Sequence, residues 1–112
     1  MQILDSFGLE GLQDECGGLY STGRHPSVNM CLPPVLWQTY DVEFTAARWE
    51  GETRTAKARM TVVHNGVTTY VEQEIPKDTT AAPEKERPGP MYLYLQDHGH
   101  DILFRNIWLV PR

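Results

Sequence analysis

The sequence offers little material for a helix, a membrane span or a nucleic-acid interface. No segment carries apolar residues at helical spacing, and every strong periodicity has a period of two, which favours an all-β fold. No apolar run reaches the length of a membrane span, so we expect no membrane partner. The ten Lys and Arg residues are scattered through a chain of net charge −5, which excludes the basic stripe of a nucleic-acid-binding protein. No basic segment followed by an apolar one opens the chain, so we expect no signal peptide in this sequence.

Cysteine is also scarce, and its spacing matches no zinc or redox motif. Cys16 and Cys31 flank a segment rich in glycine, serine and proline. Two interpretations stay open: buried reduced thiols, or a disulfide worth about 3 kcal/mol in an oxidising compartment. The chain has no Gly-rich phosphate loop, no Gly-x-Ser-x-Gly elbow and no His-Glu-x-x-His motif. No pair of carboxylates stands out for a retaining or inverting glycosidase mechanism.

Segments of alternating polarity indicate where the strands lie within a single domain at residues 1–112. The strongest signal is Asn65-Gly66, which predicts a type I′ hairpin between strands at residues 58–64 and 67–74. Further strands are predicted at residues 2–6, 37–45, 91–96 and 102–110. Residues 76–90 are charged and rich in proline and alanine, and we expect a mobile surface loop there.

Alternation also predicts which side chains share a face. In residues 37–45 one face carries Tyr40, Val42 and Phe44, and the other carries Trp37, Thr39, Asp41 and Glu43. In residues 102–110 we expect Phe104, Asn106 and Trp108 to face the core, with Asn106 as a buried, hydrogen-bonded amide. Arg105 then lies on the outer face, where it could bind vicinal hydroxyls, polarise a carbonyl oxygen, or simply tie down loop carbonyls.

The turn at residues 97–100 holds the side chains best suited to chemistry. A histidine beside a carboxylate, as in His98 and Asp97, can act as a general base near neutral pH. Asp97, His98 and His100 could instead bind a divalent metal ion, if Gly99 lets the backbone turn so that they converge. The alternative is a tight turn in which Asp97 and the histidines cap backbone groups.

Four further residues are candidates for contacts with a substrate. An exposed Trp37 would be a stacking platform for a pyranose ring, although a tryptophan at a strand start is often a core residue. Gln2 and Asp5 lie on opposite faces of the predicted first strand, and Gln96 immediately precedes the turn. The remaining histidines, His25 and His64, are predicted to lie on the surface.

Five blocks of the chain resemble, in order, motifs of the 3-keto-disaccharide hydrolase domain family. They are E-x-Q-I-L-D-S at residues 1–8, GGLY at 16–20, PP…WQTYD at 33–41, HNG at 63–67 and QDHG at 96–99. Family domains usually carry a comparable stretch of strands before the first block, and the residues here correspond to the C-terminal portion. The resemblance implies an all-β, concanavalin A-like jelly-roll sandwich without those N-terminal strands.

The resemblance further implies an enzyme that binds carbohydrate and cleaves glycosidic bonds of 3-keto sugars by base-assisted elimination and hydration. His98 with Asp97 would supply the base or the metal ligands, and Arg105 or a divalent ion would polarise the ketone. A bacterial periplasmic or extracellular location is implied as well. A non-catalytic carbohydrate-binding or interaction module is the alternative, since a fold does not dictate a function.

A sandwich built from only its C-terminal portion would leave an apolar sheet face and the strand edge at residues 2–6 uncovered. Proteins avoid exposing such surfaces. We therefore expect a homo-oligomer, in its simplest form a two-fold dimer.

Overall fold

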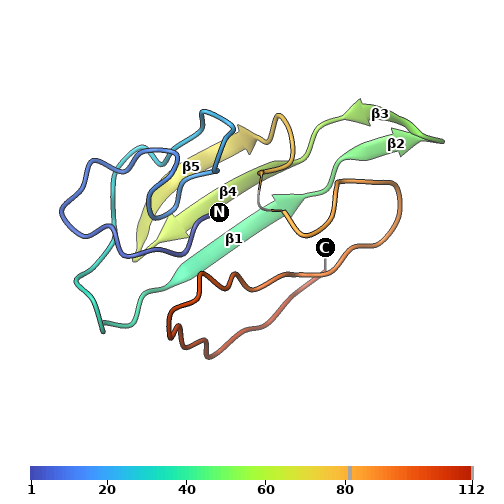
Figure 1. The fold of residues 1–112 in the computed structure, drawn as a ribbon. Coiled ribbons are helices and arrows are strands. Elements are labelled where there is room, and N and C mark those ends of the chain that lie inside the picture. Colours follow the sequence, from blue (N-terminus) through green and yellow to red (C-terminus); the bar gives the residue numbers. More distant parts are fainter. Residues whose placement is uncertain (81, 112) are drawn as a thin grey trace.

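Five antiparallel strands form the regular structure of the protein (Figure 1). The structure is a computed structural model that describes residues 1–80 and 82–111. The strands are β1 (Tyr40–Thr45), β2 (Arg48–Glu50), β3 (Thr53–Ala56), β4 (Arg59–His64) and β5 (Val67–Glu74). No helix occurs among the described residues, and hence none able to span a membrane. The all-β prediction is confirmed, and the antiparallel sheets are consistent with a β-sandwich.

The hairpin of β4 and β5 forms where Asn65-Gly66 predicts it. Both turn residues have positive φ, 50° at Asn65 and 81° at Gly66, as a type I′ turn requires. The Asn65 side chain also holds neighbouring loops, because its Nδ2 donates to the Met30 carbonyl at 2.7 Å and its Oδ1 accepts from the Thr39 N–H at 2.8 Å. β1 pairs with the other side of β4, so the sheet order is β1-β4-β5.

A second, shorter hairpin extends the first pairing rather than forming a separate unit. β1 pairs with β4 up to Thr45 opposite Arg59, and β2 pairs with β3 from Arg48 opposite Ala56 in the same register. The two ladders are therefore one long hairpin that opens at residues 46–47 and 57–58 (Figure 1). We did not predict β2 and β3 from the sequence. The signal was a two-residue loop that begins with Gly51, whose φ is 59°.

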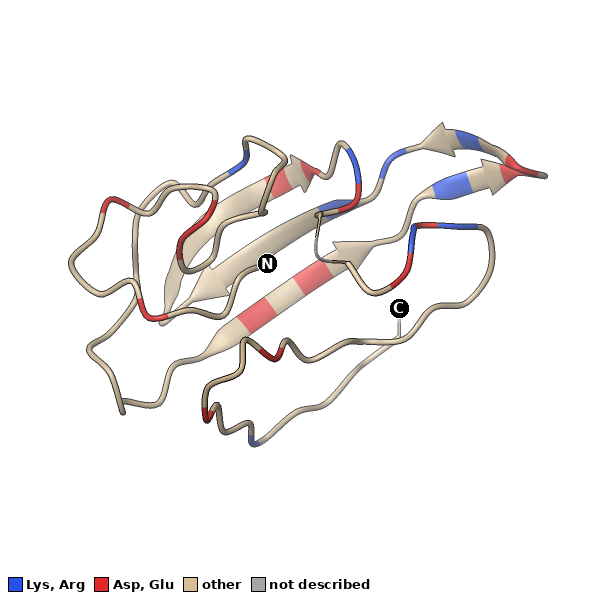
Figure 2. Ribbon diagram, viewed as in Figure 1, with Lys and Arg blue, Asp and Glu red and all other residues tan. Residues whose placement is uncertain are grey.

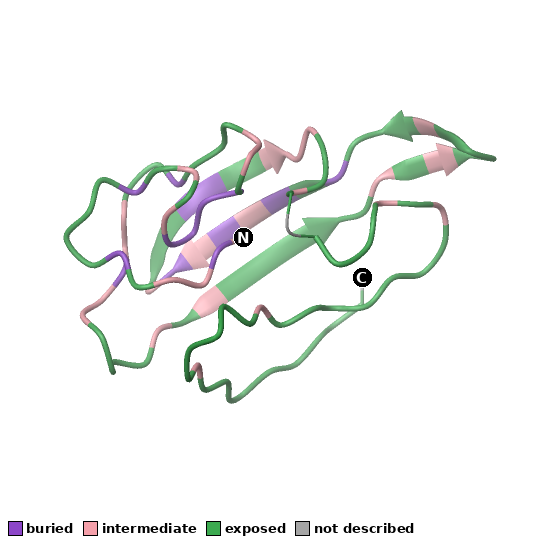
Figure 3. Ribbon diagram, in the orientation of Figure 1, coloured by how far each residue is buried: buried purple, intermediate pink, exposed green. Residues whose placement is uncertain are grey.

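The core lies on one face of the three-stranded sheet. Its buried members are Leu19, Met60, Val62 and Tyr70, and the Tyr70 hydroxyl donates to the Gly17 carbonyl at 2.9 Å. The β1 alternation is confirmed, because Val42 pairs with Val62 and Phe44 with Met60 on this same face. The cover extends over β4 and β5 but not over β1, as the burial colours of Figure 3 show. Val42 and Phe44 are consequently 47% and 61% exposed.

The strand predicted at residues 2–6 is wrong. The Gln2 N–H donates to the Gly18 carbonyl and the Gly17 N–H donates to the Gln2 carbonyl, both at 2.9 Å, and no ladder continues from this pair. The end of this segment is held by a side-chain hydrogen bond instead, because the Ser6 hydroxyl accepts from the Cys16 N–H at 2.9 Å. Position 18 requires a glycine for a separate reason, since a Cβ there would collide with the Gln13 carbonyl oxygen.

The two strands predicted at residues 91–96 and 102–110 are also wrong, and so is the core they were expected to form. Both segments are coil and join no ladder. Phe104 is 40% exposed and Trp108 76% exposed. Asn106 is exposed rather than buried, and its φ of 52° interrupts the extended backbone. Polar and apolar side chains alternate in both segments, but a strand also needs the edge of a neighbouring strand to accept its hydrogen bonds.

The segment at residues 76–90, described at 76–80 and 82–90, contains no strand or helix. It is attached to the rest of the chain by an ion pair and by hydrogen bonds, one of which the Pro76 carbonyl accepts from the Arg54 guanidinium at 3.4 Å. Glu86 forms an ion pair with Arg54 at 2.6 Å, and the Thr80 hydroxyl hydrogen-bonds with that of Ser21, also at 2.6 Å. Its mobility remains an expectation from composition.

Candidate functional site

The corner near the C-terminus encloses a hollow of about 460 Å³. Its polar walls come from Gln96, Asp97, His100 and Asp101, and its apolar walls include Leu95 and Phe104. Asp101 was not among the predicted site residues, although its position directly after His100 was a usable signal. Two carboxylates and an imidazole therefore border one concave surface, which is the kind of place where a polar ligand binds.

The turn at residues 97–100 has the structural role predicted as the alternative to catalysis, in which Asp97 caps a backbone group. The Asp97 Oδ1 accepts a hydrogen bond of 2.7 Å from the Gly99 N–H, and Gly99 has a φ of 74°. This is an Asx turn, which explains an aspartate two residues before the glycine. His100 lines the hollow and His98 does not. The geometry thus favours His100 over His98 as the imidazole nearest a ligand.

Two predicted substrate-binding residues meet beneath this corner. The Gln96 Oε1 accepts from the Ile3 N–H at 2.7 Å, and the Gln96 Nε2 donates to the Gln2 Oε1 at 2.6 Å. Gln2 is buried, so this pair connects the corner to the start of the chain across more than ninety residues. A buried amide pair of this kind orients Gln96, which borders the hollow.

Trp37 and Arg105 form a second predicted pair that the fold brings together. The Arg105 guanidinium carbon lies 3.7 Å from the centroid of the Trp37 ring, in a cation–π contact. Trp37 is 48% exposed, so it is neither a core residue nor a fully exposed one. Asp5 stays apart from this pair and is used locally, because its Oδ1 accepts from the Phe7 N–H at 3.3 Å.

The described residues contain no group of three His, Cys, Asp or Glu side chains that could hold a metal ion. The expected ligand set Asp97, His98 and His100 does not converge, because Asp97 is turned toward the Gly99 N–H and His98 lies outside the hollow. These residues do not fit a three-ligand metal site.

The prediction that His64 lies on the surface is wrong. The residue is 2% exposed and stacks on Tyr40, with ring centroids 4.2 Å apart. Its Nε2 is 3.0 Å from the Gln38 Oε1. Burial lowers the pKa of His64, so the imidazole is neutral near pH 7 and serves the packing of β1 on β4. The usable signal was alternation, because His64 lies two residues after the buried Val62 and four after the buried Met60, on the same face of β4.

The two cysteines are buried free thiols, as one of the two interpretations of the sequence held. The Cys16 Sγ lies 3.2 Å from the Tyr40 hydroxyl, and the Cys31 Sγ accepts a long hydrogen bond of 3.5 Å from the Ser6 N–H. Burial raises the pKa of Cys16 to about 11 and also raises that of Tyr40. Neither the Cys16 thiol nor the Tyr40 hydroxyl is ionised near neutral pH, so neither is an activated nucleophile.

The fold and the site together define the class of the protein, which is an all-β domain with carboxylates and histidines at its C-terminal corner. The model of the family described as "3-keto-alpha-glucoside-1,2-lyase-like domain" matches residues 1–110, nearly the whole chain. The chain belongs to this family, and the resemblance found in its motifs is confirmed. No curated protein and no solved structure gives a match.

Proposed function

We propose that this domain cleaves the glycosidic bond of 3-keto glycosides by elimination followed by hydration. Membership of the family over residues 1–110 supports the substrate class. The observation that carries the site is the hollow at the C-terminal corner, where His100, Asp97 and Asp101 lie together on one surface. An imidazole at this place can supply the general base that the reaction needs.

The ketone at C3 makes the proton on C2 acidic, so a weak base can begin the reaction. The base removes this proton, and the C–H electron pair passes into an enolate on C2, C3 and the ketone oxygen. The enolate then re-forms the ketone as a C1=C2 double bond develops and the C1–O bond breaks. The leaving oxygen departs with the electron pair of that bond and takes up a proton. Addition of water across C1=C2 completes a net hydrolysis.

We assign the base to His100, because imidazoles are the commonest general bases in enzymes and this one lines the hollow. Asp97 and Asp101 line the same hollow as His100. Arg105 is the candidate that polarises the ketone oxygen, and the half-exposed Trp37 ring is the candidate platform for the sugar. His98, in the same turn, remains the second candidate for the base.

One observation favours a non-catalytic carbohydrate-binding module as the alternative. The Trp37–Arg105 pair combines an exposed aromatic ring with hydrogen-bond donors and contains no general base. Such a pair can bind a sugar without reacting with it. Catalysis would require the C-terminal corner with His100, whereas carbohydrate binding without catalysis would require only the Trp37–Arg105 pair.

A 3-keto-glucoside with a chromogenic aglycone tests the proposal directly. We expect the wild type to release the aglycone in the presence or absence of a chelator, and His100→Ala to lower the rate by about 10²-fold or more while sugar binding persists. His25→Ala, which changes an exposed histidine far along the chain, is the matched control. No release by the wild type, with binding abolished by Trp37→Ala and not by His100→Ala, would instead establish the binding module. A tenfold loss in His98→Ala with none in His100→Ala would move the base to His98.

A further inference from the structure

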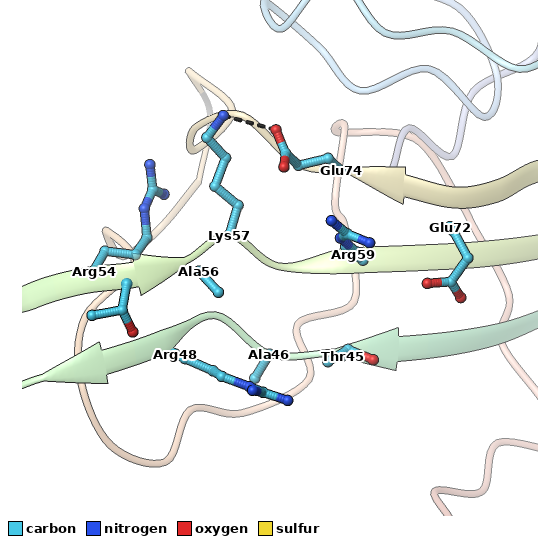
Figure 4. A pocket seen from close by; sticks show the side chains of 10 residues that line it. Thr45, Ala46, Arg48, Arg54, Ala56, Lys57, Arg59, Glu72 and Glu74 are labelled. Carbon is cyan, nitrogen blue, oxygen red and sulfur yellow. Dashed lines mark hydrogen bonds and ion pairs between the residues drawn. The ribbon is translucent and has the colours of Figure 1, made fainter.

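The long hairpin opens between its two ladders, and a cavity of about 690 Å³ occupies the opening (Figure 4). Paired residues border it on both sides, Thr45 with Arg59 on one and Arg48 with Ala56 on the other. The volume is within the range of sites that bind small molecules. The opening lies at the β2–β3 end of the molecule and shares no lining residue with the hollow at the C-terminal corner.

Basic side chains dominate the walls of this opening. Its four cations are Arg48, Arg54, Lys57 and Arg59, and its two carboxylates are Glu72 and Glu74. Only ten Lys and Arg residues occur in the whole chain, whose net charge is −5. Figure 2 shows the basic segments gathered on β2, on β3 and at the start of β4. A local excess of positive charge in an acidic chain focuses an attractive field on anions.

Part of this charge is already neutralised within the protein. Lys57 forms an ion pair with Glu74 at 2.7 Å, drawn as the dashed line in Figure 4, and Arg54 forms one with Glu86 at 2.6 Å. Arg48, Arg59 and Glu72 remain outside these ion pairs, a net charge of +1, and the two arginines come from opposite borders of the opening (Figure 4). Two guanidinium groups in this position suit an oxyanion, because each can donate paired hydrogen bonds to it.

A β-bulge brings a carboxylate to the same opening. Val71 and Glu72 on β5 both lie opposite Thr61 on β4, where the register shifts. Glu72 has a φ of 45°, a conformation that residues with a side chain rarely adopt. The Thr61 hydroxyl accepts from the Glu72 N–H at 3.0 Å and donates to its carboxylate at 3.4 Å. Bulges commonly redirect a side chain at functional positions, and this carboxylate can accept hydrogen bonds from ligand hydroxyls.

We propose that the opening binds a small oxyanion that also carries hydroxyl groups, as acidic and phosphorylated monosaccharides do. Arg48 and Arg59 engage the oxyanion, and Glu72 accepts hydrogen bonds from the hydroxyls. The site is independent of the proposed catalysis, because the two places have no residue in common.

Calorimetric titration of the whole protein at low salt tests the proposal with four probes: glucuronate, glucose 6-phosphate, inorganic phosphate and glucose. We expect saturable binding of glucuronate and glucose 6-phosphate, weaker binding of phosphate alone, and none of glucose. Arg48→Gln with Arg59→Gln should weaken the first two by about tenfold or more, since hydrogen bonds to charged groups are lost. The conservative double variant Arg48→Lys, Arg59→Lys should retain part of the affinity, which separates lost contacts from a lost fold.

Two variants identify which part of the proposal holds. Arg87→Gln, which changes an exposed arginine paired with Glu84 in the loop, is the charge-matched control and should bind as the wild type does. Glu72→Gln should lower the affinity for glucose 6-phosphate relative to that for inorganic phosphate, because the hydroxyls lose an acceptor while both anions gain from the removal of a negative charge. Equal binding of glucose, equal loss in Arg87→Gln, or phosphate binding as tight as that of glucose 6-phosphate would overturn the proposal.

Discussion

The protein exposes more surface than a folded monomer of its size, and this excess predicts self-association. Its accessible surface is 8197 Å² for a mass of 12.8 kDa. A monomer of that mass typically exposes about 6,300 Å², so the excess is about 1,900 Å². The radius of gyration is 14.3 Å, against about 13 Å for a compact chain of this length. A standard interface buries about 800 Å² on each partner, less than half of the excess.

The apolar face of β1 is the surface we expect a second copy to cover. Val42 and Phe44 point to the same side as the core but lie beyond its cover, and they are 47% and 61% exposed. We therefore propose that two copies pack through this face and form the two-fold dimer expected from the sequence. Completing a sandwich layer in this way would bury the apolar surface that a monomer leaves in water.

Phe44→Asp is the substitution that tests this interface. A phenylalanine offers about 200 Å² of surface, and the exposed 61% of it corresponds to about 3 kcal/mol on burial. A two-fold dimer loses this amount twice, about 6 kcal/mol, which would raise the dimer Kd by about four orders of magnitude. Because area overestimates affinity, we take a hundredfold increase as the smallest supporting result, roughly 3 kcal/mol.

Sedimentation velocity over a range of micromolar concentrations measures the effect. The wild type should sediment as a dimer and Phe44→Asp as a monomer with an unchanged circular dichroism spectrum. Val71→Asp, at a comparably exposed position on β5 at the opposite edge of the sheet, is the control and should remain dimeric. A wild type that is monomeric throughout, or a Phe44→Asp variant that dimerises normally, refutes the reasoning.

Three further predictions concern stability and reactivity. Val35 has a φ of 62°, which is strained for a β-branched residue, so Val35→Gly should raise the free energy of unfolding in urea by about 1 kcal/mol; a decrease contradicts this. Burial lowers the pKa of His64, so the unfolded state binds more protons below about pH 6.5, and stability should fall as the pH decreases from there. His64→Gln should remove that slope, and an identical slope in the variant would exclude His64 as its source. Burial raises the pKa of Cys16 to about 11, so Ellman's reagent should modify it at pH 8 only after denaturation, and rapid labelling of the folded protein would contradict its enclosure.

Local geometry made the central sheet predictable. The Asn65-Gly66 turn needs positive φ at two adjacent positions, and these residue types favour it regardless of the rest of the chain. Val42 and Phe44 alternate with polar neighbours, so their shared face followed from the period of a strand. The motifs that indicate the family are also local runs of sequence, and the match over residues 1–110 confirmed them.

The candidate site was predictable only as a set of residue types. The sequence identified Gln2, Gln96, Trp37 and Arg105 separately, but their pairing across the chain depends on how the loops pack. The choice between His98 and His100 depended on the backbone direction at Gly99, which a period of two does not describe.

The sequence by itself determined the all-β class, the β4–β5 hairpin and the faces of β1, because these follow from turn conformation and side-chain alternation. The tertiary structure alone decided the rest. Residues 102–110 alternate as a strand does, yet they remain coil and Trp108 stays exposed, because no strand edge accepts their hydrogen bonds. Alternation puts His64 on the core face of β4 with Met60 and Val62, but it is the pairing of β1 with β4 that places Tyr40 against its ring. Alternation specifies which way side chains can point, whereas the partners that a segment finds in space determine whether it becomes a strand and what it buries.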